Sequence, residues 1–180
     1  MKLKGIDILL VQELWCNRTS KIIEAAAHDL NLNAIFECRK RRGGGLGVVF
    51  NPHLKVRQLK YETKNCFEMQ EIEIECNNET IKVNNLYRNP YSAKNRHTVN
   101  DFVEEYENFL SKEVVMVNNK SYHVGDYNIH WEKQDDYDTI NFKKLLQRYN
   151  LIQNVTKPTH KNGGILDFLI TSESDDSVEK

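Results

Sequence analysis

The stretch "EIEIECNNETIKVNNLY", residues 71–87, alternates acidic and apolar side chains and then passes through a polar turn into a second apolar run. Glutamates at 71, 73 and 75 alternate with apolar residues at 72, 74 and 76, which is the two-residue period of a strand with one wet face. "NNET" has the residue types of a turn. The segment therefore predicts a β-hairpin in which residues 81–87 form the partner strand.

Further strands and helices are predicted on both sides of this hairpin. Apolar runs indicate strands at 5–13, 33–38, 45–52, 121–129, 151–155 and 164–171. The first of these, "GIDILLVQE", is typical of a strand buried on both faces. Helical spacing of apolar residues predicts helices over 20–30, 98–110 and 139–150, the second with a capping pair of Thr98 and Asp101.

The order of these elements predicts the class of fold. Helices lie between some strands and tight hairpins between others, which favours an α/β layered fold with mixed sheets over a strict βαβ repeat. No linker or internal repeat divides the chain, so residues 1–172 are predicted to form one domain. The remaining residues, 173–180, form a polar, acidic tail that we expect to fray.

Composition narrows the class of partner and compartment. With a net charge of −1, the protein as a whole does not attract nucleic acid or an anionic membrane, so a polyanion would have to bind a local basic patch. The four cysteines have no metal-ligand spacing, and no signal peptide or membrane span is present. We therefore expect reduced thiols and a nuclear or cytoplasmic protein that is neither secreted nor bound to a membrane.

Polar side chains recur where the predicted strands end. These residues are Glu13, Tyr87, Arg88, Asp126, Asn128, Thr159 and, inside the last apolar run, Asp167. A carboxylate within "GILDFLI" is costly to bury unless something pairs with it or binds it. Converging carboxylates repel one another unless a cation lies among them, and oxygen-only ligands suit Mg²⁺.

Each of these residues also has a purely structural interpretation. Asp126 and Asn128 are ordinary turn formers, Tyr87 fits a core position, and Glu13 fits a surface position. His123 in the strand before Asp126 is predicted to be a neutral, hydrogen-bonded core histidine. "GGGLG", residues 43–47, is not a P-loop because no Lys-Ser/Thr pair follows it.

Five motifs in order distinguish these interpretations. "VQELW", "GGGLGVVF", "LYRNPYS", "VGDYNIHW" and "PTHKNGGILDFLITS" resemble the successive motifs of the endonuclease/exonuclease/phosphatase superfamily across residues 6–172. More narrowly, they resemble the apurinic-endonuclease-like domain of non-LTR retrotransposons. The resemblance implies a deoxyribonuclease-like, four-layer α/β/β/α sandwich with two mixed, mainly antiparallel sheets.

The resemblance also implies roles for the residues that match the motifs. Glu13 would bind Mg²⁺ or Mn²⁺, Tyr87 would contact the scissile phosphate, and Asp126 would be the general base. Asn128 would hold phosphate and base in place. Thr159 and Asp167 match the last motif, in which the aspartate orients a catalytic histidine. Phosphate contacts are predicted for Arg88 and for the basic run Arg39, Lys40, Arg41 and Arg42, although that run also fits a solvated turn or a localisation signal.

Two motifs of the family are expected to lie outside this chain, so the domain is expected to be incomplete. One is a first strand ending in N-x-R and the other a last strand led by S-D-H; His130 or His160 could substitute for that histidine. The implied function is Mg²⁺-dependent nicking of double-stranded DNA, leaving a 3′-hydroxyl that primes a reverse transcriptase fused in the parent element. The alternatives are an inactive remnant that keeps the fold and DNA binding, and a small-substrate phosphatase of the same superfamily.

Overall fold

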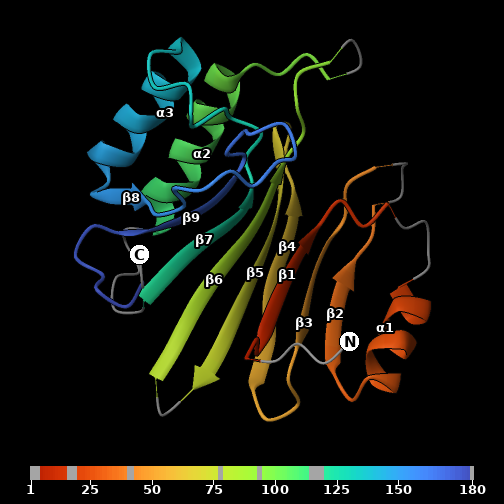
Figure 1. Ribbon diagram of the computed structural model, residues 1–180. Coiled ribbons are helices and arrows are strands. Elements are labelled where there is room, and N and C mark those ends of the chain that lie inside the picture. Colours follow the sequence, from red (N-terminus) through yellow and green to blue (C-terminus); the bar gives the residue numbers. More distant parts are fainter. Residues whose placement is uncertain are drawn as a thin grey trace.

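Two stacked sheets form the centre of the computed structural model, which describes residues 5–15, 20–39, 43–76, 79–92, 95–113 and 120–178 (Figure 1). Sheet A has the strand order β1-β3-β2 and sheet B the order β4-β5-β6-β7-β9-β8. The strands of sheet A are β1 (Ile8–Gln12), β2 (Asn33–Glu37) and β3 (Leu46–Phe50). Those of sheet B are β4 (Lys55–Thr63), β5 (Phe67–Cys76), β6 (Glu79–Arg88), β7 (Lys120–Asp126), β8 (Leu151–Gln153) and β9 (Asp167–Ser172).

Three helices in the described part of the chain cover the outer faces of the two sheets (Figure 1). Helix α1 (Ser20–Asp29) packs beside β2 on sheet A. Helices α2 (Val99–Glu113) and α3 (Tyr137–Arg148) lie together against sheet B. All strand pairs are antiparallel except β6 with β7. This arrangement confirms the four-layer α/β/β/α sandwich with mainly antiparallel sheets, of which sheet A is purely antiparallel and sheet B is mixed.

Residue parity along β5 and β6 assigns their side chains to two cores. Phe67, Met69 and Leu86 pack against the aromatic faces of α2 and α3. The opposite faces carry Ile72 and other apolar residues that pack against β3 of sheet A. Because successive side chains of a strand point to opposite faces, one hairpin supplies both the helix-facing core and the inter-sheet core.

Most of the predicted elements are confirmed. The hairpin of residues 71–87 is β5 and β6 joined in antiparallel register. The capping pair before α2 forms as predicted, with the Thr98 amide donating to Asp101 at 2.7 Å and the Asp101 amide donating to Thr98 Oγ1 at 3.2 Å. His123 is buried and hydrogen-bonded to the Tyr106 hydroxyl at 2.9 Å, and burial lowers its pKa to about 4.

One prediction about sheet A was wrong. Strand β1 is at the edge of its sheet, and Leu9 is 41% exposed, so the strand is not buried on both faces. Helix α1 forms as predicted, and Ile22 on its apolar stripe is 68% exposed.

Strand β4 and a disulfide also differ from expectation. No strand was predicted over 55–63, where Lys55, Arg57 and Lys60 occupy exposed positions of an edge strand and Arg57 pairs with Glu73 of β5. Cys38 is disulfide-bonded, whereas Cys66 and Cys76 are free thiols. Residues 173–178 form turns in which the Ser177 hydroxyl lies 2.7 Å from that of Tyr122. None of the described helices is both long and apolar enough to cross a membrane.

Gly125 provides a test of the close approach between β6 and β7. Its φ is +148°, and an added Cβ would lie 1.9 Å from the Leu86 carbonyl oxygen. We expect Gly125→Ala to lower the free energy of unfolding by at least about 3 kcal/mol, because the backbones themselves must separate. Gly163→Ala, where φ is +87° but space is open, should cost roughly 1 kcal/mol. Equal losses in urea titrations of the two variants would contradict this close approach of the two backbones.

Candidate active site

Four polar side chains form a row across sheet B at the end where β6 and β7 finish. The strand register pairs Glu68 with Tyr87, Tyr87 with Asp126, and Asp126 with Asp167. These residues come from β5, β6, β7 and β9, and directly opposed residues of neighbouring strands project on the same side of the sheet. The row is on the side that faces sheet A. The register therefore brings together three residues that were predicted separately: Tyr87, Asp126 and Asp167.

Glu13 reaches this row from sheet A. It follows β1 in a left-handed conformation, with φ of 54°, and its carboxylate accepts a hydrogen bond from the Tyr87 hydroxyl. The glycine-rich loop before β3 holds the same turn: the Trp15 amide donates to the Gly44 carbonyl at 3.0 Å. Burial and the neighbouring Glu13 carboxylate raise the pKa of Tyr87 well above its usual range, so the phenol stays a neutral donor.

Asp126 is a partly buried carboxyl surrounded by negative charge. Burial is the main cause that raises its pKa to about 7, and the charges of Asp167 and Glu13 add to it. The Asn128 amide opposes this shift by donating to Asp126 Oδ1 at 3.0 Å. A carboxyl with a pKa near neutrality can exchange a proton at physiological pH, as a general base must.

A buried arginine holds the turn that follows Asp126. Arg88 is 3% exposed, and its Nη1 donates to the carbonyls of Tyr127 at 3.2 Å and Asn128 at 3.1 Å. In return, Asn128 Nδ2 donates to the Arg88 carbonyl at 2.7 Å. Asn128 has a left-handed φ of 50°, so this reciprocal clasp fixes a conformation that few residues adopt. The guanidinium predicted to meet DNA is thus directed into the protein.

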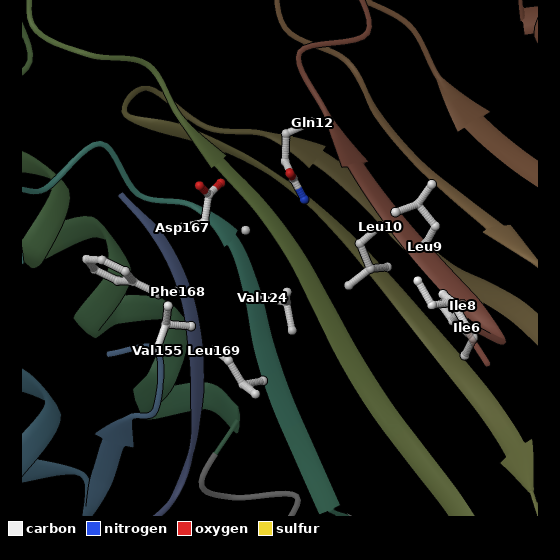
Figure 2. Close-up of a pocket in the computed structure, with 11 residues that line it drawn as sticks. Ile6, Ile8, Leu9, Leu10, Gln12, Val124, Val155, Asp167, Phe168 and Leu169 are labelled. Carbon is white, nitrogen blue, oxygen red and sulfur yellow. The ribbon is translucent and has the colours of Figure 1, made fainter. Parts of the chain in front are cut away.

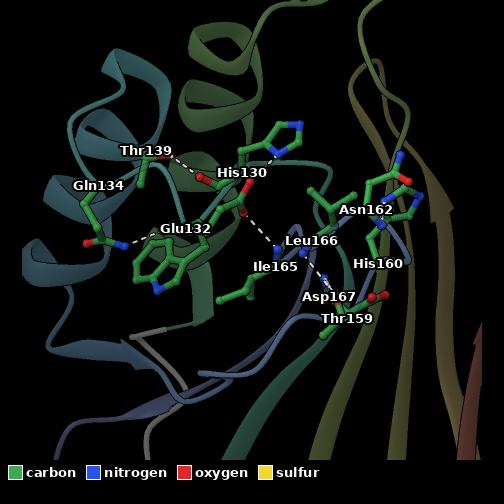
Figure 3. Close-up of polar contacts among 11 residues, drawn as sticks. His130, Glu132, Gln134, Thr139, Thr159, His160, Asn162, Ile165, Leu166 and Asp167 are labelled. Atoms are coloured by element: carbon green, nitrogen blue, oxygen red, sulfur yellow. Dashed lines mark hydrogen bonds and ion pairs between the residues drawn. The ribbon is translucent and has the colours of Figure 1, made fainter.

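The loop before β9 is fixed through Thr159 (Figure 3). Its hydroxyl accepts hydrogen bonds from the amides of Leu166 and Asp167, each at 3.1 Å. Glu132 supports the same loop by accepting the Ile165 amide at 2.9 Å. Thr159 therefore positions the start of β9 and with it Asp167.

His130 and His160 have partners of their own near this loop. His130 Nδ1 lies 2.7 Å from Glu132 Oε1, and His160 Nδ1 accepts the Asn162 amide at 3.3 Å (Figure 3). Both rings are at exposed positions. Within the described part of the chain, neither forms a hydrogen bond or ion pair with Asp126 or Asp167.

Glu68, at one end of the row, is a fully buried carboxylate that the sequence did not reveal. It forms an ion pair with Arg39 and accepts hydrogen bonds from the Gly45 amide at 2.9 Å and the Tyr61 hydroxyl at 2.8 Å. A Cβ at Gly44 would lie 2.1 Å from its Oε1, so only glycine fits there. Arg39 is thus engaged by Glu68, while Lys40, Arg41 and Arg42 lie outside the described residues.

Buried amides below the row were also missed. Asn85 and Gln70 are fully buried and face sheet A, as does Tyr87 two residues beyond Asn85. Their positions in the strands could have revealed them, because alternate side chains of a strand point to the same face. Gln70 therefore lies on the face of Ile72, and Asn85 on that of Val83. Polar residues at inward positions of a strand require partners, and here those partners belong to the other sheet.

An apolar groove of about 440 Å³ opens between β1 and the strands β7 and β9 (Figure 2). Aliphatic side chains such as Leu10, Val124 and Leu169 line it, and Gln12 and Asp167 lie at its polar end. The groove thus ends at the row of polar residues.

The donors present fit a hard divalent cation held in part by substrate. Among the residues that the structure describes, no group of three or more His, Cys, Asp or Glu side chains could hold a metal by itself. Mg²⁺ is commonly bound through one or two carboxylates, completed by water and a substrate phosphate. Glu13 is exposed at this end of the sheets, and the charges of Glu13 and Asp167 raise the pKa of Asp126, a repulsion that a cation would relieve.

The raised pKa of Asp126 predicts a pH-dependent effect on stability. Folding keeps this carboxyl protonated up to about pH 7, whereas in the unfolded chain it ionises near pH 4. The folded state therefore binds the extra proton between these values, and the free energy of unfolding falls as pH rises through this range. Without divalent metal, Asp126→Asn should raise the free energy of unfolding by about 1–2 kcal/mol at pH 8, after allowance for partial exposure, and should change it little at pH 4.

Urea titrations at the two pH values in EDTA measure this difference. Asp135→Asn, at an exposed turn position, is the matched control and should change stability by less than about 0.5 kcal/mol at either pH. A gain for Asp126→Asn that is the same at pH 4 and pH 8 would show that the carboxyl has no raised pKa.

Comparisons with known proteins agree with this architecture. The profile of the Endonuclease/Exonuclease/phosphatase family matches residues 1–178. No curated protein matches the sequence. The structure resembles the endonuclease domain of TRAS1, a telomere-specific non-LTR retrotransposon, with a TM-score of 0.60 and 16% identity over 94% of this chain and 74% of that one.

Two further solved structures share the fold. An AP endonuclease from Archaeoglobus fulgidus has a TM-score of 0.62 and 15% identity, covering 94% of this chain and 77% of that chain. A humanized D. rerio TDP2 has a TM-score of 0.65 and 12% identity, covering 98% and 74%. At these identities the likeness shows the fold alone. Because the family profile spans nearly the whole chain, the protein belongs to the endonuclease/exonuclease/phosphatase family.

Proposed function

We propose that this protein is a divalent-metal-dependent DNA endonuclease domain of the non-LTR retrotransposon type, which hydrolyses a phosphodiester bond and leaves a 3′-hydroxyl. The observation that carries the proposal is Asp126, a carboxyl whose pKa of about 7 suits a general base. It lies in register with Tyr87 and Asp167 and receives the Asn128 amide. The resemblance of the motifs to retrotransposon endonucleases and the TRAS1 structure support the choice of substrate.

In the proposed reaction, Asp126 takes a proton from a water molecule while the oxygen of that water attacks phosphorus. The bond from phosphorus to the 3′-oxygen breaks, and the leaving oxygen takes a proton from solvent water to become the 3′-hydroxyl. General base catalysis of this kind contributes about 10²–10⁴-fold to the rate. Asn128 keeps the base oriented through its amide, and Asp167 keeps the pKa of the base high through its charge.

Tyr87 and Glu13 would act on the phosphate side of the site. The Tyr87 phenol is neutral and can turn its hydrogen bond from Glu13 to a phosphate oxygen, where donors stabilise developing charge. Glu13 would then be the residue that holds Mg²⁺ or Mn²⁺. When bound, such a cation polarises the phosphate oxygens and neutralises their charge.

Nicking of supercoiled plasmid in the presence of Mg²⁺ tests the proposal. We expect Asp126→Ala to slow the conversion to open circles by at least about 10²-fold, because the general base is lost. Asp135→Ala, at an exposed turn, is the matched control and should nick at the wild-type rate. A DNA polymerase should extend the nick, which reports the 3′-hydroxyl.

Three outcomes would contradict the proposal. Equal rates for the wild type and Asp126→Ala would show that the activity does not use this site. A folded wild-type protein that binds plasmid but nicks nothing at any Mg²⁺ concentration would support an inactive remnant. Hydrolysis of a small phosphate monoester without nicking would support a phosphatase.

A further inference from the structure

The two sheets contribute unequally to the candidate site. Only Glu13 comes from the end of a sheet A strand, whereas Tyr87, Asp126 and Asp167 belong to sheet B. The separation of Glu13 from the other groups therefore depends on how one sheet is seated on the other. Side chains that fix this seating also fix the site.

A chain of buried and partly buried side-chain amides crosses between the sheets directly below the site. We call this chain the amide seam; its members are Gln12, Asn85, Gln70 and Gln58, and it ends on Glu37. Gln12 Nε2 donates to Asn85 Oδ1 at 2.6 Å, and Asn85 Nδ2 donates to Gln70 Oε1 at 3.2 Å. Gln70 Nε2 donates to Gln58 Oε1 at 2.8 Å, and Gln58 Nε2 donates to Glu37 Oε1 at 2.7 Å.

The amide seam contacts all three strands of sheet A. Asn85 Nδ2 lies 3.1 Å from the Gly47 carbonyl of β3 and 3.4 Å from the Val11 carbonyl of β1. Glu37, where the seam ends, is the last residue of β2. Asn85 is the centre of these contacts, since it is fully buried and bonded to β1, β3 and β5.

Part of the inter-sheet interface is apolar and has no directional contacts of this kind. There Val48, Phe50, Ile72 and Val83 pack as an apolar cluster. Apolar burial is non-directional and tolerates a small slide of one surface over the other. Hydrogen bonds to buried amides do not, because a buried amide that loses its partner is left without the hydrogen bonds that water gave it in the unfolded chain.

We propose that Asn85 is a positioning residue that sets the register between the two sheets, through Gln12 and the Val11 carbonyl, and so places Glu13 opposite Tyr87 and Asp126. The proposal rests on the proposed function for its catalytic consequence, but not for the geometry. Gln12 directly precedes Glu13, and Asn85 shares a face of β6 with Tyr87, so each end of the Glu13–Tyr87 contact adjoins the Gln12–Asn85 hydrogen bond.

The test compares Asn85→Leu with Asn84→Leu. Asn84 is equally buried on the same strand, but its Nδ2 bonds Ser121 Oγ at 3.3 Å on the helix-facing side. Without any metal, hydrogen exchange by NMR reports the Leu14 and Trp15 amides, which donate to the glycine loop and hold the Glu13 turn. We expect Asn85→Leu to speed their exchange at least tenfold relative to amides of α2, and Asn84→Leu to leave that ratio unchanged.

A second readout is the affinity for Mn²⁺, followed by the EPR signal of the free ion. We expect Asn85→Leu to weaken binding at least tenfold, and its nicking rate to recover as Mg²⁺ is raised, since Glu13 is displaced but not lost. Asp126→Ala should show no such recovery. Gln12→Met, at a partly buried position, removes one hydrogen bond of the seam and is the variant to use if Asn85→Leu does not fold.

The outcomes separate this proposal from the proposed function. Unchanged relative exchange at Leu14 and Trp15 in both Asn85→Leu and Gln12→Met would overturn the positioning role, whatever the activity. Equal effects of Asn84→Leu and Asn85→Leu would also overturn it, because they would show a general loss of stability. A wild-type protein that neither binds Mn²⁺ nor nicks DNA would overturn the proposed function, while the exchange result would still decide the role of Asn85.

Discussion

The hydrogen bonds around Asn85 join two sheets that also meet through an apolar cluster and through polar contacts at Glu68 and Tyr87. A fully buried amide has to satisfy its donors and acceptor within the protein, and Asn85 does so with β1, β3 and β5 at once. These hydrogen bonds restrict how sheet A is seated on sheet B. The end of β1 is then fixed relative to the end of β6, which is the condition for Glu13 to meet Tyr87.

Electrostatics at the site follow from that seating. The carboxylates of Glu13, Asp126 and Asp167 interact at one end of the sandwich, and the pKa of Asp126 is raised mainly by burial. Tyr127 and Asn128, which follow Asp126 in the chain, are held by Arg88, whose buried guanidinium donates hydrogen bonds to their carbonyls. The clasp stabilises the turn, while burial and the charges of Asp167 and Glu13 together keep the pKa of the Asp126 carboxyl at about 7. A perturbed carboxyl on a rigid sheet is a common property of catalytic acids and bases.

The sequence predicted local structure better than it predicted the relations between distant strands. The period of residues 71–76 and the capping pair at Thr98 depend on neighbours in the chain, and both predictions are confirmed. The ordered motifs predicted Tyr87, Asp126 and Asp167 as site residues, and the register places them side by side, although their roles stay proposals. The seam could be suspected from parity alone, but the partner of Asn85 lies 73 residues away and no local pattern identifies it. Strand β1 was wrongly predicted to be buried on both faces, and strand β4 was not predicted. Both are edge strands, and the burial of a strand depends on which strands lie beside it, which the local sequence does not specify.

We propose that residues of both sheets form one divalent-metal site. Titration of Mn²⁺ into the ¹⁵N-labelled protein tests it most directly, because the ion broadens the amide signals around it. We expect the signals of Glu13 from sheet A and of Tyr87, Asp126 and Asp167 from sheet B to broaden together at the lowest Mn²⁺ concentrations. Broadening confined to residues of a single sheet would contradict this proposal. So would broadening confined to the acidic segment 173–176 near the C-terminus.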